Sequence, residues 1–172
     1  MGDPKKKRSK YFTPSHPWQR ARIEEERVLV KDYGLKNKRE VWKMRSKVKK
    51  FADQVKKLSG ISTKQAEKEK ELLQKRLVKM GLLKPSASLG DALGLSVKDI
   101  LERRLQTVVF RKGLAKSVTQ ARQFVSHGHV TVKGRKMAVP SYIVLADEEG
   151  AIGFSPSSSL SSQEHPERVV KK

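Results

Sequence analysis

Residues 102–144 read ERRLQTVVFRKGLAKSVTQARQFVSHGHVTVKGRKMAVPSYIV and contain more structural signals than any other stretch of the chain. Two helix-start patterns, Ser-x-x-Asp at Ser96 and Ser-x-x-Gln at Ser117, predict a helix on each side of a short loop. We expect the first helix to continue past Arg111. Arg104 and Arg111, seven residues apart, would then lie one above the other on one helix face.

A hairpin is expected after the second helix. Apolar and polar residues alternate next to a Lys133-Gly134 turn, and a further strand is expected over 141–145, directly after a proline. This strand would close a small antiparallel sheet. Residues 96–145, which we call the module, therefore predict a helix-loop-helix packed on a sheet, which makes the chain α+β.

The preceding residues predict a helical region over 20–95. Helices are expected at 20–33, 38–58 and 63–80, the second with apolar residues at alternating spacings of three and four. In the third helix the residues expected to face inward are Ala66, Leu72, Leu73, Leu77 and Met80. Residues 1–19, with three prolines and a basic run, predict an extended arm, and residues 146–172 a C-terminal strand and a flexible Ser-rich tail.

The chain is strongly basic. Its 172 residues carry 39 Lys and Arg against 18 Asp and Glu, a net charge of +21. Residues 1–50 contribute +11 and residues 97–145 contribute +8, whereas residues 146–172 contribute −2. Self-repulsion at this charge opposes compaction, so we expect a negatively charged partner, with nucleic acid as the first candidate and an anionic membrane surface as the second. A membrane is not expected, because no apolar run of about 18 residues exists, and the absence of cysteine excludes disulfides and thiolate zinc sites.

Structured RNA fits the pattern better than DNA does. The second module helix offers one Arg and one Gln outward, too few side chains to read a major groove. RNA is recognised by shape, phosphates and 2′-hydroxyls, which spaced Lys and Arg can contact. The lysines of the 38–58 helix have almost no acid between them, which favours phosphate contact over a merely solvated face.

The histidines and tryptophans have less specific interpretations. His127 and His129 do not predict a metal site, because no further ligand lies nearby; an RNA contact and a half-buried helix end both stay open for them. Trp18 and Trp42 are interpreted as anchors of the N-terminal core rather than as base-stacking platforms. No phosphate-loop motif occurs, and we predict no catalytic residue, no metal and no cofactor.

The module resembles the S-four RNA-binding fold, a helix-loop-helix-plus-sheet unit shared by a ribosomal protein and several RNA-modifying enzymes. The matching positions cover the whole module and include Arg104-Leu105, Val109 to Gly113, Ser117, Ala121-Arg122, His127 to Val130, Lys133-Gly134 and Pro140 to Tyr142. Gln106 stands where bacterial members usually carry Asp, and Lys133 where they tend to carry Asn.

The rest of the chain is similar to the archaeal and eukaryotic branch of the small-subunit ribosomal protein S-four family, where Gln106 is expected. The similarity includes Thr13-Pro14 and Tyr33 to Trp42. It implies a cytoplasmic, ribosome-bound structural protein that binds small-subunit rRNA early in assembly, at a multi-helix junction, and supports decoding accuracy. Further implied partners are neighbouring small-subunit proteins and messenger RNA near the place where it enters the ribosome. Neither a membrane nor a homo-oligomer is implied.

The expected RNA contacts fall into two sets. Those carried over from the resemblance are Arg103, Arg104, Arg111, Lys112, Lys116, Ser117, Gln120, Arg122, His127, His129, Lys133 and Arg135. Those that follow from the basic arm and the basic helix, which would thread between rRNA helices, are Lys5, Lys6, Lys7, Arg8, Lys43, Lys47 and Lys50.

Two other functions use the same module. An RNA-modifying enzyme would need a separate catalytic domain with an aspartate in a sizeable core, and the acids outside the module lie on helix faces or in the tail. A quality-control factor that binds stalled ribosomal subunits would not need the N-terminal arm or the Tyr33 to Trp42 block. The ribosomal interpretation is therefore preferred.

Overall fold

The structure is a computed structural model that describes residues 2–3, 9, 11–162 and 165–168. The fold is α+β, as predicted. Four expected RNA contacts lie outside the described residues, namely Lys5, Lys6, Lys7 and Arg8. Among the helices of the described part, none is long and apolar enough to cross a membrane.

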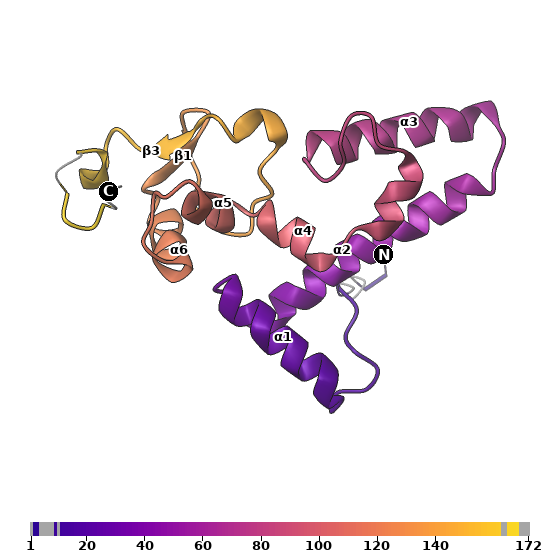
Figure 1. The fold of residues 1–172 in the computed structure, drawn as a ribbon, viewed down its shortest axis with the longest axis horizontal. Helices are drawn as coiled ribbons and strands as arrows, with labels where there is room; N and C mark the ends of the chain where they lie inside the picture. Colours follow the sequence, from indigo (N-terminus) through magenta and orange to yellow (C-terminus); the bar gives the residue numbers. More distant parts are fainter. Residues whose placement is uncertain (1, 4–8, 10, 163–164, 169–172) are drawn as a thin grey trace.

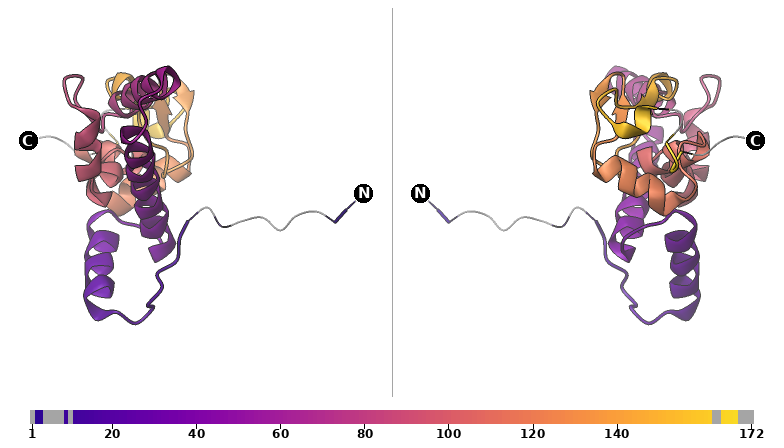
Figure 2. Two further views of the ribbon diagram at one scale, coloured as in Figure 1. Left: turned by 90° about the vertical axis from the view of Figure 1, so that its right-hand side faces the viewer. Right: turned by 90° about the vertical axis from the view of Figure 1, so that its left-hand side faces the viewer.

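A long central helix, α2 (Lys38–Ser59), organises the N-terminal part of the fold (Figure 1). The elements packed on it are α1 (Arg20–Asp32), α3 (Lys64–Lys79), the 3-10 helix η1 (Leu89–Gly94) and α4 (Val97–Glu102). In Figure 2, α1 and the segment before it form one end of the molecule, and α3 lies at the other end.

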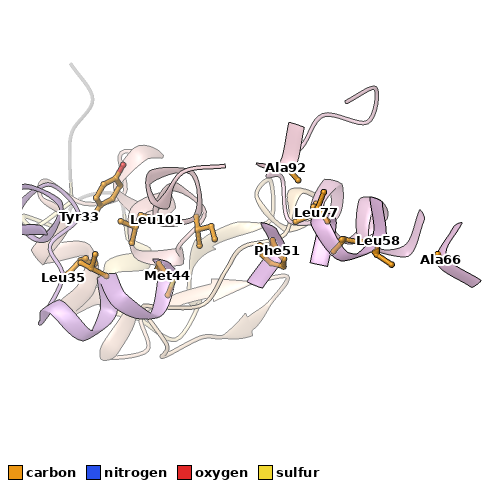
Figure 3. Packing of buried hydrophobic residues seen from close by; sticks show 13 residues of the cluster. Tyr33, Leu35, Met44, Phe51, Leu58, Ala66, Leu77, Ala92 and Leu101 are labelled. Atoms are coloured by element: carbon orange, nitrogen blue, oxygen red, sulfur yellow. The ribbon is translucent and has the colours of Figure 1, made fainter. Parts of the chain in front are cut away.

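α2 forms where the sequence predicts it. The side chain of Asn37 caps its first turn by accepting a hydrogen bond from the backbone N–H of Glu40 at 3.3 Å. The predicted apolar stripe is buried, Val48 only partly. Figure 3 shows the cluster that the stripe forms with its neighbours, with Tyr33, Leu35, Met44, Phe51, Leu58, Ala66, Leu77, Ala92 and Leu101 labelled. Burying such side chains stabilises the fold by about 1.5–3 kcal/mol each for the larger ones.

The second part of the fold contains α5 (Leu105–Arg111), α6 (Val118–Ser126) and a three-stranded antiparallel sheet of order β2-β1-β3. The strands are β1 (Val130–Val132), β2 (Arg135–Lys136) and β3 (Ile152–Phe154). α5, α6 and this sheet enclose a second hydrophobic cluster. In the structure we keep the name module for residues 105–154, which contain α5, α6 and the sheet.

The first module helix differs from the prediction. Residues 97–111 form two helices, α4 and α5, and the backbone between them is extended at Arg104. The N–H of Leu105 donates to the carbonyl of Tyr142 at 2.8 Å, where a continuous helix would have supplied an acceptor from its own preceding turn. The expectation that Arg104 and Arg111 share one exposed face is therefore wrong: Arg104 is 1% exposed and precedes α5 as its N-cap.

The strand expected over 141–145 is also absent from the described sheet. That segment forms an isolated bridge, between Arg104 and Ile143, and β3 takes the third place in the sheet. The backbone of this segment instead bonds to the residues between α4 and α5, since the N–H of Val144 donates to the carbonyl of Arg103 at 2.8 Å.

Three expectations about exposed segments need correction. Leu72 is 65% exposed, because it lies about 100° around α3 from the buried Leu73. Trp18 is 90% exposed, because Arg22 binds the carbonyls of the two residues before it and leaves its ring outside, whereas Trp42 is an anchor whose Nε1 donates to Glu26 at 2.9 Å. The Ser-rich tail packs on the module through a buried leucine, Leu160.

Gly34 and Gly128 provide a matched test of the packing between α2 and the module. Both have positive φ, +54° and +76°, so alanine at either should cost about 1–2 kcal/mol in backbone strain. A Cβ at Gly34 would also lie 3.0 Å from Nε2 of Gln106, whereas one at Gly128 would meet nothing within 4 Å. Gly34→Ala should therefore be the more destabilising by about 1–3 kcal/mol in urea unfolding. Equal destabilisation by the two changes would mean that the packing at Gly34 is loose.

Candidate nucleic-acid interface

Glu40 holds the module against α2. Its carboxylate accepts hydrogen bonds from Arg104 at 2.6 Å and from Arg122 at 3.1 Å. Burial alone would raise the pKa of the Glu40 carboxyl, but the hydrogen bonds and charges of the two arginines outweigh it and hold this pKa below its usual value. Because Glu40 stays ionised, the buried guanidinium of Arg104 has a counter-ion.

Gln106 makes a second, neutral connection at the same interface. Its side chain is fully buried, and its amide nitrogen donates to the carbonyls of Gly34 at 3.1 Å and Val118 at 2.9 Å. An ionised aspartate at this position would offer acceptors only, so it could not donate to these carbonyls. Glutamine in place of the aspartate usual in bacterial members therefore has a structural role here.

Glu102 connects the two parts of the fold a third time. It accepts from the hydroxyl of Tyr33 at 2.8 Å and from Arg111 at 2.9 Å. Burial, together with the hydrogen bond to Glu102, raises the pKa of Tyr33 to about 12, so its hydroxyl remains a donor. The pair between Glu102 and Arg111 is exposed, which leaves Arg111 able to exchange this partner for a phosphate.

Glu149 occupies two further basic side chains of the expected site. The guanidinium of Arg103 donates to its carboxylate at 2.7 Å and to the carbonyl of Val144 at 3.1 Å, and the ammonium group of Lys112 donates to its backbone carbonyl. Five basic residues expected to bind RNA thus bind Glu40, Glu102 or Glu149, namely Arg103, Arg104, Arg111, Lys112 and Arg122.

A groove of about 600 Å³ lies between α2 and residues 140–141 of the module. One of its walls carries the three lysines expected from the basic helix, Lys43, Lys47 and Lys50. All three side chains reach solvent, although the ammonium group of Lys47 is half-buried. Among the described residues that line the groove, the acid is Glu40, which is already paired with two arginines. We call this the lysine groove.

Lys47 lies where the lysine groove meets a second pocket, of about 550 Å³. Burial, followed by the positive charges of Arg104 and Arg76, lowers the pKa of its ammonium group. Cations that repel one another in this way are stabilised by a bound anion. The electrostatics of the groove therefore favour a phosphate.

The remaining expected contacts lie on the module away from the groove. Ser117 caps α6 by accepting from the N–H of Gln120, and His129 shares a 2.8 Å hydrogen bond with Ser158. Lys116 donates to the carbonyl of Pro166 at 3.2 Å. The other three side chains are exposed, namely those of His127, Lys133 and Arg135. No group of three metal-ligating side chains occurs among the described residues.

Sequence reasoning missed Arg76. It assigned no function to α3, yet Arg76 lines the second pocket together with Lys47 and Lys50. The available signal was its place in the last turn of α3, next to Leu77, which the apolar pattern correctly placed inward. A basic residue beside a buried one at a helix end can reach over the neighbouring helix.

Comparison with known proteins assigns this architecture. Residues 103–149 match the family described as S4 domain. A protein of Methanococcus aeolicus named small ribosomal subunit protein uS4 is 50% identical over 98% of this chain and 96% of its own length. Proteins of the same name from Ignicoccus hospitalis and Methanothermobacter thermautotrophicus are 48% and 49% identical, over 92% and 95% of the chain and 95% of each relative.

The fold and the domain match define a translation protein built around an S4 RNA-binding domain. Because the similarity to the archaeal relatives extends over nearly the full length, the chain belongs to the small ribosomal subunit protein uS4 family. The resemblance seen in the sequence is thereby confirmed. Relatives that match nearly the full chain are small ribosomal subunit proteins, which favours the ribosomal interpretation over the RNA-modifying enzyme.

The pair of arginines on Glu40 can be tested by Glu40→Gln. This change should destabilise the protein by about 3–5 kcal/mol in urea unfolding near neutral pH, because the buried Arg104 loses its counter-ion. The control is Glu71→Gln, which removes the exposed partner of Lys75 and should cost less than about 1 kcal/mol. Similarly small destabilisation in both variants would mean that Arg104 finds another partner.

The same pair predicts a pH dependence. The pKa of Glu40 in the folded protein lies below its ordinary value of 4.5. The stabilisation that ionised Glu40 contributes is therefore complete above pH 4.5, and it is lost as the pH falls through the lower pKa of the folded state. The stability difference between the wild type and Glu40→Gln should shrink on acidification. Urea unfolding across this range would contradict the assignment if the difference stayed constant.

Proposed function

We propose that this ribosomal protein binds small-subunit rRNA directly, with the lysine groove as the centre of the contact. The observation that carries the proposal is the row of Lys43, Lys47 and Lys50 along a groove whose lining acid is already neutralised. A phosphate backbone in the groove would relieve the repulsion among these cations. RNA duplexes offer phosphates and 2′-hydroxyls at regular spacing, which suits such a row.

We propose different roles for the exposed and the buried basic residues. The exposed residues contact RNA. Those on the module are Lys116, His127, Lys133, Arg135 and Arg111, and Ser117 and Gln120 lie beside them at the start of α6. Arg104 and Arg122 fix the angle between α2 and the module through Glu40, whereas Arg103 and Lys112 bind Glu149, which precedes β3. The arm residues Lys5 to Arg8 stay in the proposal on their charge, and His129 stays in it on the resemblance.

Finer aspects of the function follow from the resemblance. We propose that the arm, the helical region 20–95 and the RNA-binding module expected at 96–145 bind at a multi-helix junction early in assembly and act in the cytoplasm. Support for decoding accuracy, contacts with neighbouring small-subunit proteins and contact with messenger RNA belong to the same proposal, as does a monomeric state apart from the ribosome. The strong positive charge supports early binding, because it accelerates association with a polyanion.

The lysine groove can be tested by changing Lys43, Lys47 and Lys50 to Gln together. Binding to the 5′ domain of small-subunit rRNA would be measured over a range of salt concentrations, with tRNA of equal mass as the competitor. The plot of log affinity against log salt should become less steep by about one for each phosphate that the variant no longer neutralises. Affinity should fall for rRNA, and the preference over tRNA should shrink with it.

The matched control changes Lys64, Lys68 and Lys75 to Gln. These lysines are exposed on α3, so the net charge falls equally while the lysine groove is untouched. An equal fall in affinity for both triple variants would mean that net charge, not the groove, governs binding. A wild-type protein with no preference for rRNA over tRNA would overturn the proposal and favour a quality-control role.

A further inference from the structure

The pocket next to the lysine groove has an apolar floor. Its volume is about 550 Å³, within the roughly 300–1,000 Å³ typical of pockets for small ligands. Phe51 of α2, Met80 at the end of α3 and Ile143 of the module line it. Phe51 belongs to the main hydrophobic cluster, and the other two side chains are partly buried against that cluster. The floor therefore rests on packed structure.

The rest of the lining is polar and mostly cationic. Lys47, Lys50 and Arg76 supply three positive charges, and Asp53 and Gln54 add a carboxylate and an amide. Lys47 and Lys50 also line the lysine groove, so the two depressions share a wall. A strand of nucleic acid whose phosphates follow the groove would pass the mouth of this pocket.

We propose that the pocket receives one unpaired nucleobase of the bound RNA. The inference rests on the proposed function, because it assumes that RNA lies in the lysine groove. A nucleobase has flat apolar faces and a polar edge, which fit the Phe51, Met80 and Ile143 floor and the Asp53 and Gln54 side chains. Proteins that recognise particular RNA sites commonly bind bases that are splayed out of a helix in this way.

Charge favours a nucleotide over a protein side chain as the occupant. An apolar side chain from a neighbouring protein would fit the floor, but it would leave Lys47, Lys50 and Arg76 without anions. A nucleotide brings its own phosphates to these three cations. The burial and like-charge repulsion that lower the pKa of Lys47 would be compensated by the same phosphates.

The first experiment observes the methyl group of Met80 by NMR. The protein, labelled at its four methionine methyls, would be titrated with adenosine 5′-monophosphate and, in parallel, with ribose 5-phosphate at equal ionic strength. The two ligands carry the same phosphate, and one lacks the base. We expect a saturable shift of the Met80 methyl with the nucleotide alone, while Met137, which lines neither the pocket nor the lysine groove, serves as the internal reference.

Three results would overturn the proposal that the pocket receives a nucleobase. Equal shifts of Met80 with both ligands would mean that the site binds phosphate and leaves the base outside. No shift at millimolar nucleotide would mean that the floor is closed to a base. Displacement of the nucleotide by an apolar peptide, with no effect of the 5′-domain rRNA on Met80, would assign the pocket to a protein neighbour.

The second experiment blocks the mouth with Gln54→Trp. Gln54 is exposed on α2, so the fold should tolerate the change, and Gln65→Trp at an exposed position of α3 is the matched control. Gln54→Trp should weaken rRNA binding by about tenfold, the effect expected when one base can no longer stack, with an unchanged salt slope. Wild-type affinity for Gln54→Trp, alongside a reduced salt slope for the lysine variant, would reject the pocket and keep the groove. A normal slope for the lysine variant would reject the proposed function itself.

Discussion

The buried guanidinium of Arg104 is the constraint on which the rest of the structure depends. A cation that is 1% exposed needs a counter-ion, and Glu40 supplies it from a helix 64 residues earlier in the chain. This requirement fixes where α2 lies against the module. It also explains the break between α4 and α5, since a continuous helix would carry Arg104 away from Glu40. The lysine groove exists because these two elements meet at this angle.

The basic residues of this chain have two separate physical roles. One set is neutralised inside the protein by Glu40 and Glu149, and its Glu40 pairs hold α2 against the module. The other set, chiefly on α2, faces a groove where the lining acid is already used. Composition cannot separate the two sets, because an arginine paired inside the protein and a lysine in the groove contribute equally to a net charge of +21.

Local patterns predicted local structure well. The spacing of apolar residues predicted α2, and the capping pattern at Ser96 is present as expected. The errors arose where a distant residue decides the outcome. No residue near Arg104 in the sequence indicates its pairing with Glu40, so the local pattern predicts one helix that continues through Arg104. The family was predicted correctly, whereas Arg76 and the second pocket come from the meeting of three elements and carry little local signal.

The neutral hydrogen bonds of Gln106 have a consequence for how the protein meets its partner. The hydrogen bonds that its buried amide nitrogen donates to the carbonyls of Gly34 and Val118 join uncharged groups, so dissolved ions screen them little. We expect the angle between the two halves to be the same in concentrated salt, where bound RNA would dissociate, as in dilute salt. The proposed RNA-binding surface would then be preorganised, and the entropy lost on association would come from the lysine side chains and the RNA rather than from aligning two loose halves.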